Sequence, residues 1–287
     1  MSHRILAIVV TYYPDKELLE KNVSAFIHSV DKVLIWENTP KEEKQEYCFI
    51  KDLKVEYCGD GVNSISHALN YAWKYAESNG YDYLLTMDQD SVFENFSHYL
   101  EYTIRNTQAP QGIWIPLAVT GENKPAVREK EKDIKEVFFG NTSGMLLRIS
   151  VIDRIGGWNE VFAVDGVDCE FCFHACRVGV KIYAFLNVYL RHQLGEYKKV
   201  KFLNRYFELR NYSPLRYYAI YKSHVTLMRL FPEQKEFQDT CRYYWGGMIK
   251  WIFMFESQRF RKIYYIVKGT VEGCLTPLAK VERPNQS

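Results

Sequence analysis

The sequence lacks the glycine-rich signatures of two common nucleotide-binding folds. Neither a GxGxxG nor a GxxxxGK[ST] pattern occurs in its 287 residues, so neither a dinucleotide-binding fold nor a P-loop is indicated. No apolar run reaches the ~18–20 residues that a membrane-spanning helix needs. Zinc-finger spacings, RNA-binding aromatic motifs and internal repeats are also missing, which argues against a nucleic-acid partner.

Cysteine is sparse and odd in number. The chain has seven cysteines, and its first strand-like segment begins close to the first residue, without a signal-peptide pattern before it. We therefore expect a reducing, cytoplasmic location. Cys169, Cys172 and Cys176 recur at helical spacing without a convincing fourth ligand, so we interpret them as small buried helix residues rather than zinc ligands.

Charge is unevenly distributed, although the formal net charge is only +2. Residues 200–287 carry 15 Lys and Arg against 7 Asp and Glu, which is a net +8 and leaves −6 for residues 1–199. Aromatic and basic residues also alternate through residues 242–262. This combination is typical of a helix at the inner face of a cell membrane. A helical cap on the catalytic domain and a homodimer contact remain open as alternatives.

The first 90 residues alternate between apolar strand-like runs and helix patterns. We expect strands at residues 5–12, 33–37, 53–57 and 83–87, and helices at residues 14–30 and 63–78. Strict alternation of this kind predicts βαβ units and a mostly parallel sheet flanked by helices.

The pattern is less regular after residue 90. We expect helices at residues 93–106, 149–155 and 167–178, a polar loop at residues 121–135, and strands at residues 113–119, 137–139, 144–147, 181–186 and 188–192. Beyond Leu194 the pattern is helical, basic and aromatic. The sequence thus predicts an α/β catalytic domain at residues 1–200 and a helical C-terminal extension at residues 201–287.

Polar residues follow three of the predicted strands: Thr11-Tyr12, Glu37-Asn38 and Asp88-Gln89-Asp90. In open α/β sheets the ligand lies beyond the carboxyl ends of the strands, so we expect these residues to line one crevice. The two carboxylates can hold a hard divalent cation, which a diphosphate ligand requires. On its own, Asp-x-Asp is also compatible with a surface turn.

Several motifs, in order and spacing, resemble family-2 glycosyltransferases with the GT-A fold, specifically those of the rhamnosyltransferase type. The likeness extends from about residue 5 to residue 222. It includes Ile8–Tyr12, Glu37-Asn38, Asp88–Ser91, Thr142–Gly144, Ile155–Glu160, Asp165–Phe171, His192–Gly195 and Arg216–Tyr218. The chain departs from the pattern at Val62 and Ser64, and has Glu37 where Asp is more usual, so the nucleobase is left open.

The resemblance implies a role for each motif. Asp88 would face the ribose, and Asp90, Asp88 and His192 would hold the metal, Mn²⁺ or Mg²⁺, of which Mn²⁺ is better suited to an imidazole ligand. Asp168 would be the general base, at a helix N-terminus expected to keep its pKa low. The donor nucleotide would contact Thr11, Tyr12, Glu37, Asn38 and Asp88, and the acceptor side would be bound or supported by Ser143, Gly144, Trp158, Asp165 and Glu170.

Some of these roles have rivals. Asp165 and Glu170 compete with Asp168 as the base, although Asp165 could instead cap the helix and Glu170 could pair with Arg177 or Arg191. Trp158 fits a sugar-stacking residue and a core aromatic equally well.

The predicted activity is inverting, metal-dependent transfer of a sugar, expected to be L-rhamnose from dTDP-rhamnose, from a nucleoside diphosphate to a bacterial polysaccharide or lipid-linked glycan. A galactofuranosyltransferase that uses a UDP-sugar is the nearest alternative. A nucleotidyltransferase would call for a glycine-rich phosphate loop with a Lys near the first strand, and a non-catalytic scaffold would call for the loss of Asp90 or Asp168. The sequence shows none of these features.

Overall fold

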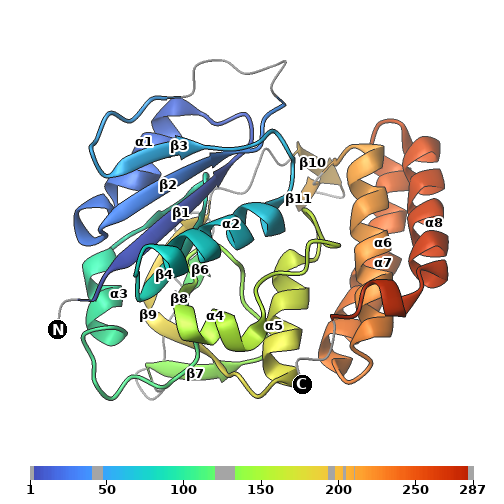
Figure 1. Cartoon of the computed structure of the whole chain (residues 1–287). Coiled ribbons are helices and arrows are strands. Elements are labelled where there is room, and N and C mark those ends of the chain that lie inside the picture. Colours follow the sequence, from blue (N-terminus) through green and yellow to red (C-terminus); the bar gives the residue numbers. More distant parts are fainter. Residues whose placement is uncertain are drawn as a thin grey trace. The chain divides into compact units, whose positions relative to one another are not determined.

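The chain divides into two compact units, Met1–Gln193 and Leu194–Ser287, slightly before the predicted division at residue 200. The structure is a computed structural model that describes residues 3–40, 48–119, 133–192, 198–202, 205–209 and 211–283; for 198–202 and 205–209 it describes the backbone alone. Figure 1 shows the course of the chain.

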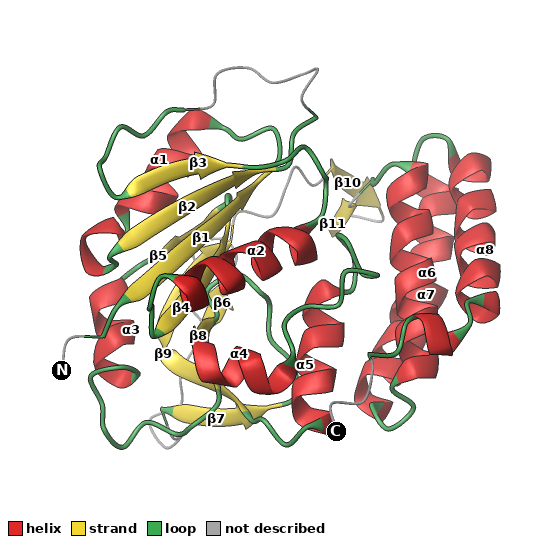
Figure 2. Cartoon of the chain, viewed as in Figure 1, coloured by secondary structure: helices red, strands yellow, loops and turns green. Residues whose placement is uncertain are grey.

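The first unit is built on a mixed nine-stranded sheet, visible in Figure 2. Its strands run in the order β3 (Val55–Cys58), β2 (Lys32–Glu37), β1 (Ile5–Thr11), β4 (Tyr83–Asp88), β8 (Leu146–Arg148), β6 (Ile113–Val119), β9 (Ile182–His192) and β5 (Ser91–Phe93), while β7 (Ile134–Val137) pairs with β9. The strands from β3 to β4 are parallel, as the alternating pattern predicts. Beyond β4, antiparallel pairs enter the sheet through β8, β5 and β7.

In the described part of this unit, five α-helices accompany the sheet: α1 (Lys16–Ser24), α2 (Ile65–Ser78), α3 (Phe96–Tyr102), α4 (Ile149–Ile155) and α5 (Val167–Arg177). Alternate residues of β1 point to opposite faces, and Ile5, Ala7 and Val9 join a core cluster with side chains of α1 and α3. Figure 1 shows α2 and α4 on the other face. Both faces are therefore buried, which explains why every residue of β1 is buried.

Side-chain caps mark where α1 and α2 begin. The Asp15 carboxylate accepts from the Leu18 N–H, and the Ser64 hydroxyl accepts from the His67 N–H. These bonds satisfy amides that have no partner within the helix. At the other end of α4, Gly156 adopts φ 85°, a left-handed conformation that a glycine tolerates without a Cβ clash. The short elements are thus specified locally.

Several predicted boundaries were wrong. The first helix ends at Ser24, and a 3₁₀ turn at Ile27–Ser29 follows it in place of a continuous helix to residue 30. The strand predicted at residues 53–57 begins only at Val55. The two strands predicted at residues 181–192 form one strand, β9. It pairs with β6 along its length, with a register shift between Pro116 and Leu117.

Two further predictions misplaced strands. Ser91–Phe93 pairs with β9, so the helix predicted from residue 93 begins only at Phe96. The strand predicted at residues 137–139 lies at Ile134–Val137. Most of the predicted polar loop at 121–135 falls outside the described residues.

The first described elements of the second unit are two antiparallel strands rather than a helix. Its strands are β10 (Lys198–Phe202) and β11 (Arg205–Leu209). Three helices follow: α6 (Pro214–Leu230), α7 (Lys235–Phe255) and α8 (Arg259–Leu275). Tyr217, Tyr221, Ile252 and Ile266 form a buried core among them. Within the described residues, no helix has both the length and the apolar character needed to span a membrane.

Candidate active site

The ends of β1, β2 and β4 lie side by side at one edge of the sheet. Thr11 is opposite Glu37, and Val10 is opposite Asp88. The three polar segments singled out in the sequence therefore meet, because parallel neighbouring strands end at the same edge.

Glu37 is enclosed by the backbone and hydroxyl groups around it. It is buried, and its two carboxylate oxygens accept from the Thr11 hydroxyl at 3.0 Å and the Thr39 N–H at 2.8 Å. Asn38 is also buried, and its side-chain oxygen accepts from the Trp36 indole N–H at 3.0 Å. Among the residues predicted to contact the nucleotide, Tyr12 is the exposed one, at 45%.

The Asp88-Gln89-Asp90 turn is clamped from two sides. The Gln89 amide accepts from the Tyr12 N–H at 2.7 Å and donates to the Tyr12 carbonyl at 3.1 Å. The buried Asn22 side chain, from α1, donates to the Asp88 carbonyl at 2.7 Å and also to the Ser91 carbonyl. These contacts use the Gln89 side chain and two backbone carbonyls, not the carboxylates of Asp88 and Asp90.

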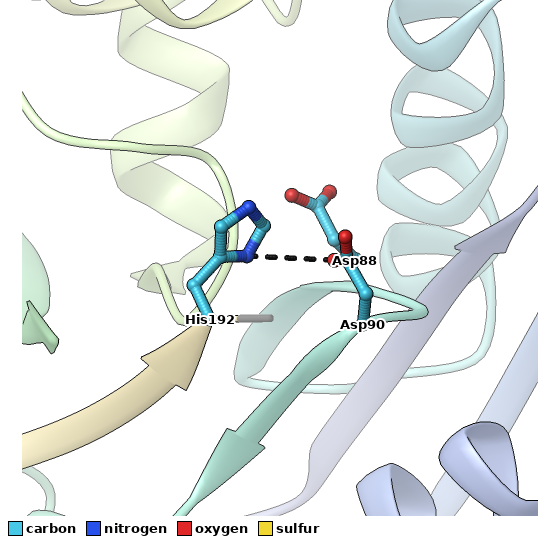
Figure 3. Close-up of side chains that lie close together, drawn as sticks. All are labelled: Asp88, Asp90 and His192. Carbon is cyan, nitrogen blue, oxygen red and sulfur yellow. Dashed lines mark ion pairs between the residues drawn. The ribbon is translucent and has the colours of Figure 1, made fainter. Parts of the chain in front are cut away.

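Asp88, Asp90 and His192 form a group suited to a metal ion, shown in Figure 3: one ligand atom from each lies within 4.8 Å of the others. His192 arrives through strand pairing, because β5 starts one residue after Asp90 and Ser91 lies opposite His192 in β9. His192 Nδ1 lies 2.8 Å from the Ser91 hydroxyl and 3.4 Å from Asp90 Oδ1. Leu194-Gly195, which supported the choice of His192, lie outside the described residues.

The electrostatics of this group suit a divalent cation. Burial and the nearby Asp90 charge raise the pKa of Asp88 to about 6, against a smaller opposing effect of His192. Burial also raises the pKa of Asp90, whose Oδ1 is buried without a hydrogen-bond donor. Two oxygen ligands with one imidazole match Mn²⁺ well and Mg²⁺ less well. The residues present therefore fit the expected metal.

Hydrogen bonds through Thr142 and Ser143 connect Asp168 to β4, the strand that ends at Asp88. The Thr86 hydroxyl, in β4, donates to the Thr142 carbonyl at 2.5 Å, and the Thr142 hydroxyl donates to Asp168 Oδ1. The Asp88 N–H donates to the Ser143 hydroxyl at 3.0 Å. The Thr142-Ser143 segment thus holds the candidate base Asp168 in a common frame with Asp88.

The pKa of Asp168 was predicted wrongly. Burial and the Asp88 charge raise it to about 7, although a hydrogen bond from the Thr142 backbone acts in the opposite direction. The helix N-terminus was expected to keep it low, but desolvation and a like charge outweigh that local effect. A carboxyl with a pKa near 7 is well matched to proton transfer at neutral pH.

The residues around α5 correct two expectations. Trp158 is 3% exposed and stacks on Phe171 with ring centroids 4.5 Å apart, so it is a core aromatic and not a sugar-stacking surface. Gly166, not Asp165, occupies the N-cap position of α5. Glu170 is buried and accepts from the Asn159 amide at 3.2 Å.

Ser143 and Gly144 lie beneath the site. Ser143 is buried, and Gly144 has φ 85° with its N–H donating to the Thr86 carbonyl at 2.7 Å. A Cβ at Gly144 would lie 2.6 Å from Pro116 Cγ. Both residues thus hold β4 through hydrogen bonds, Ser143 at Asp88 and Gly144 at Thr86.

Sequence reasoning missed Asn22, Ser91 and Thr142 as site residues. Asn22 carried a signal, because it is a polar residue in the buried stripe of α1 beside Leu19 and Val23. Ser91 and Thr142 lay within quoted motifs, but their partners His192 and Asp168 are distant in sequence. Only the tertiary contacts reveal what they support.

A cavity of about 380 Å³ opens beside the metal group. Asp90 and His192 line it together with Leu18 and Lys21 of α1 and residues of β5 and β9. Arg191 on its wall pairs with Glu94 at 2.7 Å. Two of the three candidate metal ligands, Asp90 and His192, therefore face this cavity.

Comparison with known proteins agrees with this geometry. No protein-family profile matches the chain. The chain is 24% identical over 259 residues to the dTDP-rhamnosyl transferase RfbF of Shigella flexneri, covering 79% of this chain and 83% of that protein. The chain is a rhamnosyltransferase-like glycosyltransferase. It is also 25% identical over 197 residues to the low-salt glycan biosynthesis hexosyltransferase Agl10 of Haloferax volcanii, covering 62% of this chain and 63% of that relative.

Solved structures show that this rhamnosyltransferase-like chain has the GT-A fold. GalNAc-T7 with UDP, GalNAc and Mn²⁺ superimposes with a TM-score of 0.58 at 9% identity over 79% of this chain, which spans about half (48%) of that protein. Residues 1–349 of TarS from S. aureus give a TM-score of 0.52 at 10% identity, over 94% of this chain and 71% of that one. At these identities the likeness concerns the fold.

Proposed function

We propose that this protein transfers L-rhamnose from dTDP-rhamnose, with inversion at the anomeric carbon and with the help of a divalent cation, to a bacterial polysaccharide or lipid-linked glycan. The observation that carries the proposal is the Thr142-Ser143 link, which holds Asp168 in one frame with the carboxylates of Asp88 and Asp90. A proton acceptor and a pair of carboxylates that can hold a cation for the diphosphate, in one frame, suit transfer between a hydroxyl and a diphosphate ester.

In the proposed reaction, the acceptor hydroxyl attacks the anomeric carbon from the side opposite the diphosphate. Its proton passes to the Asp168 carboxylate, and the bond to the leaving nucleoside diphosphate breaks. Attack of this kind inverts the anomeric configuration. Thr142 donates to one oxygen of Asp168 and orients the other toward the acceptor. A divalent cation bound by Asp88, Asp90 and His192 would neutralise the charge on the departing diphosphate.

The donor nucleoside is assigned to the edge formed by β1, β2 and β4. Tyr12, which is 45% exposed, lies there, and Asp88, which is half-buried, lies at the end of β4. Thr11, Glu37 and Asn38 are buried directly below and shape the floor of this edge. The name of RfbF supports the dTDP-sugar, and the name of Agl10 supports a glycan product. We propose that the reaction takes place at the cytoplasmic side of the cell membrane.

The choice of nucleotide can be tested by thermal unfolding with dTDP, UDP, GDP or CDP in the presence of Mn²⁺. A ligand at about 100 times its Kd stabilises the folded state by about 2.7 kcal/mol, so dTDP should raise the Tm most. A larger shift with UDP would replace the rhamnosyl donor with a UDP-sugar, such as a galactofuranosyl donor. Zero shifts for all four would count against a nucleotide site, and equal positive shifts would count against selection of the thymine base.

Ser91 is predicted to position His192 for metal binding. Its hydroxyl lies 2.8 Å from His192 Nδ1, which favours binding of a metal through the other ring nitrogen. Because such supporting contacts typically contribute about 10–100-fold to metal affinity, Ser91→Ala should weaken Mn²⁺ binding to that extent. Electron paramagnetic resonance of free Mn²⁺ measures this directly. Ser24→Ala, which removes an exposed hydroxyl of α1, is the matched control, and equal affinities in both variants would refute the role.

A further inference from the structure

The outward face of α8 is apolar along the whole helix. Five large residues recur at helical spacing on it, at positions i, i+4, i+7, i+11 and i+15. We call them the α8 stripe: Phe260 (71% exposed), Tyr264 (62%), Val267 (55%), Val271 (49%) and Leu275 (73%). A surface helix of a globular protein normally places polar residues on its outward face, so the stripe indicates a contact surface.

The stripe is separate from the face that α8 uses for packing within its own unit. That inner face has Ile266 at 3% exposure, with Gly269 and Gly273 backed against α6. A Cβ at Gly273 would lie 2.8 Å from the Lys222 carbonyl oxygen, so the two helices are already in close contact there. The helix α8 therefore has two apolar faces: one is buried in the core of the second unit, and the other, the α8 stripe, is exposed.

The aromatic surface continues around the turn between α7 and α8. Phe253 and Met254, at the end of α7, are each 49% exposed. The Arg259 guanidinium lies 5.6 Å from the ring centre of Phe253 and 5.7 Å from that of Phe260. Aromatic rings beside a basic side chain are the residues that anchor helices at a lipid headgroup layer.

The charges beside the stripe identify the occupant. Arg259, Arg261 and Lys268 are exposed next to it, whereas Glu272 is the acid of α8 and already lies near Lys268 and Lys222. The remaining basic residue of α8, Lys262, is buried in a pair with Glu256 and takes no part. Two α8 stripes facing each other would bring like charges together, whereas an anionic surface would be attracted to both the rings and the basic side chains.

We propose that the α8 stripe, with the Phe253-Met254 end of α7, lies flat on an anionic lipid surface and places this protein at the membrane. The proposal goes beyond the transferase function and does not depend on it. Apolar side chains enter the boundary between headgroups and acyl chains, while Arg259 and Arg261 contact lipid phosphates. This contact would concentrate the enzyme where lipid-linked acceptors are found.

The test is flotation of the full-length protein with vesicles of phosphatidylcholine, alone or mixed with phosphatidylglycerol. Wild type should float with the mixed vesicles and far less with the neutral ones. Replacing Phe260, Val267 and Val271 together by Ser should lower the partition coefficient by at least about tenfold. Because these side chains are exposed, the fold should survive, which circular dichroism and thermal unfolding would verify. The matched control is Leu53→Ser with Val161→Ser, two exposed apolar residues of the first unit, which should float like wild type.

A second variant tests whether the basic side chains are responsible for the preference for anionic lipid. Arg259→Glu with Arg261→Glu leaves the stripe intact and should abolish the preference for anionic vesicles. Unchanged flotation in both the serine and the glutamate variants would overturn the proposal. So would a wild-type dimer, detected by light scattering, that the serine variant converts to monomer while vesicle binding persists. In that case the stripe is a contact between two copies of the chain.

Discussion

Asp168→Asn should abolish sugar transfer and leave donor binding nearly unchanged. The amide keeps the shape of the carboxyl but cannot accept the proton of the acceptor hydroxyl, and loss of a general base typically costs about 10²–10⁴-fold in rate. Because the change affects the catalytic step, kcat should fall while nucleotide affinity stays within a small factor. Release of nucleoside diphosphate with a competent acceptor measures the first quantity, and calorimetry measures the second.

Asp165→Asn and Glu170→Gln are the matched controls for this variant. Asp165 lies close enough to Asp168 to raise the pKa of Asp168. Glu170 is buried two residues further along α5. Both controls should retain most of the transfer activity if Asp168 is the base. Activity of Asp168→Asn within about threefold of wild type, smaller than any expected general-base loss, would pass the role to whichever control is inactive.

The same variant should change how stability depends on pH. The folded-state pKa of Asp168 is raised from 3.8 to about 7, so its ionisation disfavours the folded state and stability is lost as pH rises through that interval. Asp168→Asn cannot ionise, so it should be more stable than wild type at about pH 8 and similar at about pH 4. Transfer by wild type should decline below about pH 7, because the base must be ionised to accept a proton.

Asp90→Ala should remove the Mn²⁺ dependence of nucleotide binding without unfolding the protein. Asp90 supplies a buried oxygen that has no donor, and its charge raises the pKa of Asp88, so its loss relieves repulsion in the metal-free protein. Nucleotide at about 100 times the wild-type Kd contributes about 2.7 kcal/mol of stabilisation, and most of this should vanish. Calorimetric titration with and without Mn²⁺ gives the affinities.

Asp90→Asn is the graded control, since it keeps the size of the side chain and one carbonyl oxygen but not the charge. It should bind Mn²⁺ more weakly than wild type and more strongly than Asp90→Ala. An Mn²⁺-dependent affinity that is the same in wild type and Asp90→Ala would exclude Asp90 from the metal site, even if transfer were lost.

The N-terminal half of the fold was predictable because its pattern is local. Each of β1, β2 and β4 is a short apolar run buried on both faces, and α2 has its own cap at Ser64. The Asp88-Gln89-Asp90 motif follows one of these runs, so its place at the sheet edge could be read from strand order alone. The glycosyltransferase prediction came from the resemblance of several motifs to family-2 glycosyltransferases, and the comparison with named relatives confirms it.

Elements that depend on distant partners were mispredicted. The three residues of β5 look like the start of a helix until β9 pairs with them, and β10 and β11 form a hairpin where a helical pattern was inferred. Trp158 was ambiguous because its exposure depends on Phe171, which lies in a different element. A strand or a buried ring is stabilised by its neighbours, so short stretches of sequence carry little information about it.

By itself, the sequence determined which chemical groups this protein brings to its site: two carboxylates spaced for a cation at a strand end, and a third carboxylate in the first turn of a helix. The tertiary structure decided how these groups behave. Pairing of β5 with β9 places His192 beside Asp90, and the Thr142-Ser143 segment joins Asp168 to Asp88. Burial then raises the pKa of Asp168, where the sequence had predicted a low one. The physical reason is that ligand type is a property of a residue, whereas distance, desolvation and charge coupling are properties of residues brought together by folding.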